Sequence, residues 1–201
     1  MPGKKRPEEE RREEILEGAF RVAARDQLGG LSVRAVAEEA GVSKGLVFFH
    51  FTDKETLLRA LLDWVLERGP RVEVPARLEA GGEDLHPAAR LVALVEHQVS
   101  LLPERRARVQ LFLDFWLMGM SRPELRDRIR AGFEAYRSQF LPFAEAAVEA
   151  MPDRFGAGDA EGLASAAVSY IQGCALQLNA DPESFDVERY VRVLRGLVAV
   201  G

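Results

Sequence analysis

The sequence predicts an all-α protein of about nine helices, and three observations support this prediction. Apolar residues recur at spacings of three and four along most of the chain, as they do on the buried face of a helix. No segment alternates apolar and polar residues for long enough to predict a strand. Glycine and proline interrupt the periodic segments often enough to divide the chain into helices of ordinary length.

The composition is typical of a folded protein without disulfides or metal clusters. Of the 201 residues, 47% are hydrophobic and 29% are charged, as in globular chains. Cys174 is the single cysteine, and three histidines are too few for a cysteine and histidine metal site. The N-terminus lacks the pattern of a secretory leader. We therefore expect a cytoplasmic protein without cofactor or metal.

The helical segments fall into two parts separated by residues 69–84, which are rich in glycine, proline and glutamate. We expect a small DNA-binding domain over residues 1–62 and a larger ligand-binding and dimerisation bundle over residues 63–201. Residues 1–62 hold eleven basic and eleven acidic side chains, so the net charge of −5 lies wholly in residues 63–201. A nucleic-acid surface on the first part is therefore compatible with the acidic chain.

Residues 31–62 contain the start and stop signals of three consecutive helices. Ser32 is placed to cap a helix over residues 33–39. Gly41 ends this helix, because the chain must turn there through a positive φ angle.

The two following helices have their own caps. Ser43 is placed to cap a short helix over residues 44–50, and Thr52 with Glu55 forms a capping box that starts a long helix at Asp53. Two short helices joined by a glycine turn and followed by a supporting helix are typical of a helix-turn-helix. The second of them has to fit the major groove of DNA, which is about 12 Å wide.

The segment LSVRAVAEEAGVSKGLVFFHFTDKETLL, residues 31–58, resembles the N-terminal DNA-binding module of TetR-family transcriptional regulators. The resemblance extends over about residues 11–62. It implies an all-helical homodimer that binds double-stranded operator DNA and releases it when a small molecule enters the C-terminal bundle. The family's habit favours repression over activation.

Nine residues are candidates for contact with DNA. Lys44 and Gly45 begin the short helix, where backbone N–H groups can meet a phosphate. The resemblance implies phosphate contacts for Lys54 and His50, and a base contact for Arg34, whose guanidinium suits guanine. Phe49 is expected to lie against a sugar or a thymine methyl group. The full set is Ser32, Arg34, Ser43, Lys44, Gly45, Leu46, Phe49, His50 and Lys54.

Each of these candidates also has a purely structural explanation. The two lysines can be solvated charges, His50 can cap its own helix end, and Arg34 can pair with Glu38 four residues later. The chain also departs from the family at Phe48, where a tyrosine is usual. This change removes one hydrogen bond to a phosphate, worth about 0.5–1.5 kcal/mol. Leu46 and Val47 also leave the expected DNA-facing side unusually apolar.

Six aromatic residues in the second part are candidates for lining an effector site. Such a stripe is more often plain core, but the resemblance favours a pocket, and Pro142 is expected to kink a long helix there. His97 and Gln98 are further polar candidates. The aromatic set suits a hydrophobic or amphipathic molecule and consists of Phe112, Phe115, Trp116, Phe133, Tyr136 and Phe140.

The segment from Gly162 to Ala180 has no charged residue, yet its polar side chains argue against a membrane span. We expect this helix and the last one, over residues 187–200, to pair with their symmetry mates in a homodimer. The core of a single-chain bundle is the alternative. The expected interface residues are Ala164, Ala167, Val168, Ile171, Tyr190, Leu194 and Leu197.

Two other classes of function fit the sequence less well. Gly156, Gly158 and Gly162 resemble a dinucleotide fingerprint only superficially, because no strand precedes them and the third glycine comes one place late. The chain has no phosphate-binding P-loop, nucleophile elbow or zinc-protease motif, so we do not expect an enzyme. A helical protein-interaction bundle without DNA binding is the alternative function.

Overall fold

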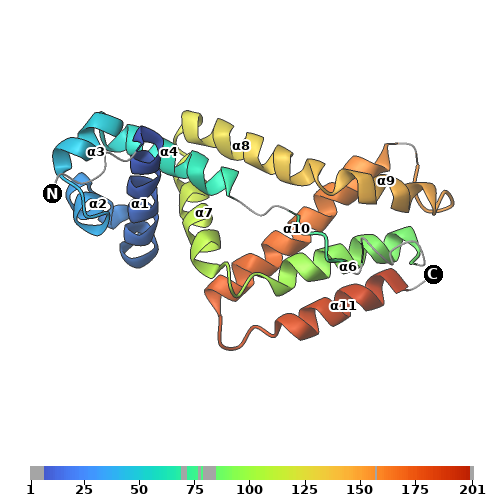
Figure 1. Cartoon of the computed structure of the whole chain (residues 1–201). Helices are drawn as coiled ribbons and strands as arrows, with labels where there is room; N and C mark the ends of the chain where they lie inside the picture. The colour runs from blue at the N-terminus through green and yellow to red at the C-terminus, as the bar shows by residue number, and fades with distance from the viewer. Residues whose placement is uncertain (1–6, 69–71, 77, 79–84, 157, 200–201) are drawn as a thin grey trace. The chain divides into compact units, whose positions relative to one another are not determined.

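The computed structural model describes residues 7–68, 72–76, 78, 85–156 and 158–199. Within these ranges it contains ten α-helices and no strand, which confirms the all-α prediction (Figure 1). The chain forms two compact units. Unit 1 comprises residues 1–69 and 110–129, and unit 2 comprises residues 70–109 and 130–201. The expected functional division after residue 62 stays a prediction. The boundaries of the two packing units differ from it chiefly because residues 110–129 pack with the N-terminal helices.

Unit 1 begins with the four helices α1 (Glu8–Gly30), α2 (Val33–Glu39), α3 (Lys44–His50) and α4 (Lys54–Glu67). The ranges predicted for the two short helices are confirmed. The prediction of Thr52 as the cap of α4 is wrong, because the Asp53 carboxylate accepts the hydrogen bond from the Thr56 backbone N–H at 2.7 Å. The cap and the helix start each lie one residue later than expected.

The core of unit 1 forms where α1 meets α2 and α4. Gly18 of α1 lies against the end of α2, and a Cβ added there would stand 2.9 Å from the Cβ of Ala40. The two helices are thus closer than any side chain at this position would allow. Among residues 7–68, the largest fully buried side chains are Ile15, Leu16, Leu31, Phe51, Leu57, Leu61 and Leu62.

Ion pairs on the surface of unit 1 join segments that are distant in sequence. Glu39 at the end of α2 accepts hydrogen bonds from Arg21 and Arg25 of α1, each at 2.9 Å. These two arginines lower the pKa of the Glu39 carboxyl. Arg122 pairs with Glu55 of α4 at 2.6 Å, which holds part of residues 110–129 against that helix.

The end of α1 departs from helical geometry at Gln27, whose φ is 59° and ψ is 174°. It is the one residue other than glycine with a positive φ among the described residues. Its side chain is exposed. The chain turns here before Leu31 enters the core and Ser32 starts α2.

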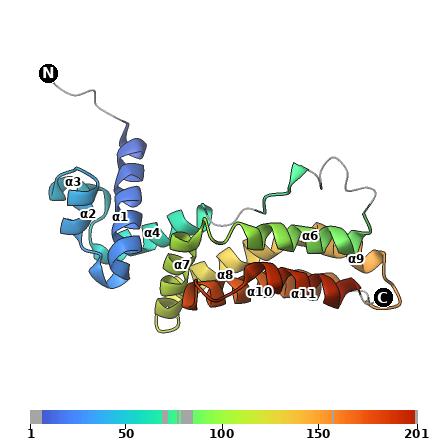
Figure 2. The same ribbon diagram turned by 90° about the horizontal axis from the view of Figure 1, so that it is seen from below.

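Unit 2 is built around α6 (Pro87–Ser100), α9 (Leu141–Glu149) and α10 (Asp159–Ala180), which pack against one another, while α11 (Val187–Ala199) lies along α6 (Figure 2). The helices α7 (Arg106–Gly119) and α8 (Pro123–Ser138) each contribute residues to both units.

Pro142 does not kink a long helix as predicted. It lies in the first turn of α9. A backbone N–H at this position has no partner within the helix, so the lack of one in proline costs nothing. The chain therefore has a helix boundary between α8 and α9 instead of a kink. None of the described helices meets the length and hydropathy needed to cross a membrane.

Candidate nucleic-acid interface and effector site

Helix α3 is held with most of its surface free. Of its seven residues only Val47 is buried. Phe51, which directly follows α3, is 1% exposed and anchors the end of the helix in the core. Phe48 and Phe49 are 50% and 70% exposed, although both are large and apolar. The helix is therefore fixed at one position and at its end, and is otherwise open to a partner.

The turn before α3 is built as the sequence predicts. Ser32 Oγ accepts a hydrogen bond from the Ala35 N–H, and Ser43 Oγ accepts one from the Leu46 N–H, both at 3.1 Å. Gly41 has a φ of +65°, which glycine adopts without strain. These features fix the angle between α2 and α3, so the two serines act first as helix caps.

The basic candidates lie at the surface of unit 1. Lys44, Gly45 and Lys54 are exposed. Arg34 forms the pair with Glu38 that was its alternative explanation, with Nε 2.8 Å from Oε1. Both side chains are largely exposed, and such a pair is weak enough to open when a better partner arrives. The roles of these residues in DNA contact stay predictions.

The remaining candidates are Leu46, Phe49 and His50, all on α3. Leu46 and His50 are half-buried. The His50 ring meets the ring of Phe49 edge-on, with centroids 5.2 Å apart, and lies 6.3 Å from the ring of Phe51. His50 thus restrains the neighbouring aromatic side chain.

The six aromatic candidates for an effector site are divided between the two units. Unit 1 contains a buried Phe115, a half-buried Phe112 and an exposed Trp116, whereas unit 2 contains a half-buried Phe133 and the buried Tyr136 and Phe140. Tyr136 and Phe140 meet edge to face, with ring centroids 5.3 Å apart. The predicted set is therefore no single cluster within either unit.

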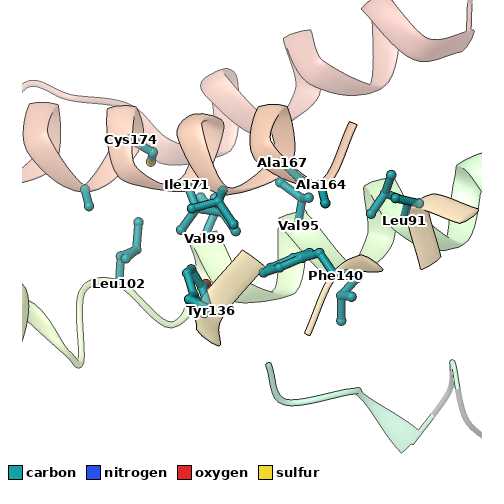
Figure 3. Close-up of a cluster of buried hydrophobic side chains, with 14 of the residues drawn as sticks. Leu91, Val95, Val99, Leu102, Tyr136, Phe140, Ala164, Ala167, Ile171 and Cys174 are labelled. Atoms are coloured by element: carbon teal, nitrogen blue, oxygen red, sulfur yellow. The ribbon is translucent and has the colours of Figure 1, made fainter. Parts of the chain in front are cut away.

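The interior of unit 2 contains polar groups among apolar ones. Tyr136 lies with Val99, Leu102 and Ile171 in the hydrophobic core (Figure 3). Its side chain is 8% exposed, and its hydroxyl has no hydrogen-bond partner among the described residues. Burial raises the pKa of Tyr136 above its ordinary value.

A second polar side chain lies on α6 of the same core. Gln98 is 2% exposed, and its Nε2 donates to the carbonyl oxygen of Glu73 at 3.0 Å, while its Oε1 has no partner among the described residues. The Glu73 carboxylate in turn pairs with Arg105. Sequence analysis identified Gln98 but missed Glu73, because that residue stands in an irregular stretch without any periodic signal.

Four of the predicted interface residues are instead part of the core of unit 2. Ala164, Ala167, Val168 and Ile171 of α10 are buried in the hydrophobic core that this helix forms with α6 and α9 (Figure 3). The prediction that these side chains face a partner is wrong, because the chain's own helices already cover them. A helix with small residues on several sides does not reveal which side packs inward.

The other predicted interface residues belong to α11. Tyr190 packs on Tyr170 with ring centroids 4.4 Å apart, and each hydroxyl donates a hydrogen bond to the backbone oxygen of the other residue, at 2.6 and 3.2 Å. Leu194 is half-buried against the core. The side chain of Leu197 lies outside the described residues. These contacts join α10 to α11 within one chain.

From Gly162 onward, the uncovered side of α10 consists of small, polar and apolar residues without charge. Ala166, Ser169 and Gln177 are exposed, and Leu176 is 57% exposed. Val193 of α11 is also exposed. An uncharged helix face of this kind is typical of a surface that another protein covers.

Comparison with known proteins gives two matches to protein families. Residues 15–61 match the family described as bacterial regulatory proteins, tetR family. Residues 87–200 match the family described as BetI-type transcriptional repressor, C-terminal. The first match covers the helix-turn-helix, and the second covers more than half of the chain.

Individual relatives agree with these matches. The HTH-type transcriptional regulator BetI of Stenotrophomonas maltophilia is 30% identical over 131 residues, which cover 65% of each protein. The HTH-type nicotine-responsive transcriptional repressor HdnoR of Paenarthrobacter nicotinovorans is 27% identical over 173 residues, 86% of each protein.

A solved structure of a protein from Saccharomonospora viridis, in complex with choline, has the same fold. Its TM-score is 0.71 at 22% identity, and the match covers 96% of this chain and 97% of that chain. At this identity the likeness concerns the fold alone.

Proposed function

The chain belongs to the TetR family of bacterial transcriptional regulators, and from this membership we propose that it is a homodimeric repressor in the cytoplasm. Helix α3 of each subunit enters the major groove of operator DNA. A small hydrophobic or amphipathic molecule binds in the bundle of unit 2 and releases the DNA.

The exposure of α3 is the observation that carries this proposal. A short amphipathic helix normally turns its large apolar residues inward. Here Phe48 and Phe49 are exposed, while Val47 is the one buried residue of the helix and Phe51 anchors its end. The capped turn between α2 and α3 gives the arrangement that places a recognition helix in the major groove.

A homodimer supplies the second recognition helix that the mechanism needs. Two copies of α3 have to meet successive major grooves, about 34–36 Å apart. We propose that the uncharged side of α10, with Ala166, Ser169 and Leu176, faces the partner subunit. We propose this face as the dimer interface in place of the four residues of α10 that were expected from the sequence and are buried in the core of unit 2.

Similar proteins that respond to or bind small molecules support an effector in unit 2. One relative is a nicotine-responsive repressor, and one structure of the same fold holds choline. We propose that this chain responds to a small organic molecule in its own bundle. Tyr136 and Phe140 are the predicted lining residues that lie in that core.

Measurement of DNA affinity tests the proposal. Duplexes bound by the full chain are first selected from a random library, and the Kd of the enriched duplex is then measured by fluorescence anisotropy over a range of salt concentrations. For a regulator, log K falls steeply with log salt, and Lys54→Ala lowers the slope by about one, because one phosphate contact is lost.

Arg106→Ala serves as the matched control. It also removes one exposed positive charge, but from unit 2, so affinity and slope stay at the wild-type values. If no duplex is enriched, the chain does not act as a DNA-binding regulator. If Lys54→Ala behaves like the control, Lys54 does not contact a phosphate.

A further inference from the structure

The two exposed phenylalanines of α3 lie where a DNA-reading helix would carry polar side chains. Exposed polar residues cost less in water than exposed aromatic rings do. Phe48 and Phe49 nevertheless keep 50% and 70% of their surface exposed. A helix that exposes two such rings next to a DNA-binding lysine gains free energy when a partner covers them.

The composition of α3 limits what it can recognise. Bases are usually distinguished in the major groove by arginine, lysine, asparagine, glutamine or an acidic residue, which match donors and acceptors on the base edges. Of these residue types, residues 44–50 contain only Lys44, at the start of the helix. The two side chains of α3 that form strong hydrogen bonds, Lys44 and His50, stand at opposite ends of the helix. The middle of α3 therefore offers a base edge only apolar contact.

Thymine is the one base that presents an apolar group in the major groove, its 5-methyl group. Phenylalanine is among the side chains that contact this methyl group. Every base presents donors or acceptors that an apolar surface leaves without partners, thymine O4 included, but only thymine offsets this cost with an apolar contact to its methyl group. The exposed face of α3 thus favours thymine by chemistry alone.

The position of Phe49 suits this contact. A helical side chain covers the surface over the preceding turn, and for Phe49 that turn contains Gly45, which has no side chain. A Cβ at Gly45 would meet only Ser43 Oγ, at 3.8 Å, so the space beside the ring is open. The edge-on contact with His50 restrains the ring before DNA arrives, which reduces the entropy lost on binding.

We propose that this protein recognises its operator through thymine 5-methyl groups, and that Phe49 is the specificity-determining residue that contacts them. The inference rests on the DNA-binding function proposed above and assigns how that function selects its sequence. It predicts that the operator has a T·A pair at the same place in both half-sites, because each subunit of the homodimer reads one half-site with α3.

Uracil substitution tests the contact one methyl group at a time. In the enriched duplex, each such thymine is replaced by uracil, which keeps every hydrogen-bonding group. We expect the wild-type protein to bind about fourfold more weakly for each methyl group that is lost, from the transfer free energy of one buried carbon. Replacement of thymines outside the positions that α3 reads leaves the Kd unchanged.

The variant Phe49→Ala identifies the residue that makes the contact. Because its ring is mostly exposed, truncation removes little packing, and circular dichroism checks that the helical content is unchanged. We expect Phe49→Ala to weaken binding to the thymine duplex and to bind the uracil duplex with no further loss, so that the two changes are not additive. Phe48→Ala is the matched control, for which the effect of uracil is the same as in the wild type.

The outcomes separate this inference from the proposed function. Failure of any duplex to be enriched overturns the DNA-binding function itself. An enriched duplex that tolerates uracil at every position overturns the methyl readout while DNA binding stands. If uracil causes no further loss of affinity in Phe48→Ala but does so in Phe49→Ala, the assignment of the methyl contact to Phe49 is wrong.

Discussion

Substitution of Gln27 by glycine is expected to stabilise the protein. The φ of 59° and ψ of 174° place Gln27 at the edge of a region that glycine adopts almost alone. A residue held in such a conformation costs about 1–3 kcal/mol. Glycine removes this cost but adds about 0.5–1 kcal/mol of backbone entropy to the unfolded chain. Because the Gln27 side chain is exposed, no packing is lost, and the net gain is about 0–2.5 kcal/mol.

The measurement is urea unfolding followed by circular dichroism, with Ala24→Gly as the matched control. Ala24 is also exposed near the end of α1, but its backbone is helical, so glycine there costs up to about 1 kcal/mol. Two glycine substitutions three residues apart are thus expected to have opposite signs. In a thermal scan, each kcal/mol corresponds to about 2–4 °C for a chain of this size.

Equal destabilisation by both substitutions would refute the reasoning. In that case the backbone at Gln27 in solution would be helical, and α1 would continue to its end without a turn. A gain at Gln27 with a loss at Ala24 would instead support a strained turn between α1 and α2.

Three further predictions concern the interiors of the two units. Gly18→Ala places a Cβ 2.9 Å from the Cβ of Ala40, so we expect a loss of about 1–3 kcal/mol in urea unfolding; unchanged stability would show that α1 and α2 separate easily. Tyr136→Phe removes a hydroxyl without a partner among the described residues and is expected to be neutral or to stabilise by about 1 kcal/mol, whereas a clear loss would reveal a hydrogen bond. Burial raises the pKa of Cys174 to about 11. Since the thiol stays protonated at pH 8, we expect the native protein to resist iodoacetamide until urea unfolds it. The unfolded thiol ionises at lower pH than the folded one, so Cys174 should lower the stability of the fold only as pH rises from about 9 towards 11. Rapid labelling of the native protein would contradict this burial.

The helix-turn-helix could be predicted from sequence because its signals are local. Ser32, Gly41 and Ser43 each act within three residues of themselves, and all three perform the predicted role. The cap of α4 shows the limit of this reasoning. Thr52 and Asp53 are adjacent and both suit a cap, so only the backbone geometry decides between them.

The second part of the chain was harder to predict, because its signals depend on neighbours distant in sequence. Periodicity shows that Phe115 and Tyr136 lie on apolar faces, but it does not show that they belong to different units. Likewise, α10 has small residues around most of its circumference, so the sequence could not indicate that Ala164 packs inward and Ala166 outward.

The slender attachment of α3 has a consequence for how such proteins diversify. Since Val47 and Phe51 hold the helix in place, most of its other positions contribute little to folding. Under the base contact proposed above, point mutations at Phe49 can change the preferred DNA sequence while the scaffold persists unaltered. A duplicated gene could therefore acquire a new target through a few substitutions, without any intermediate that fails to fold.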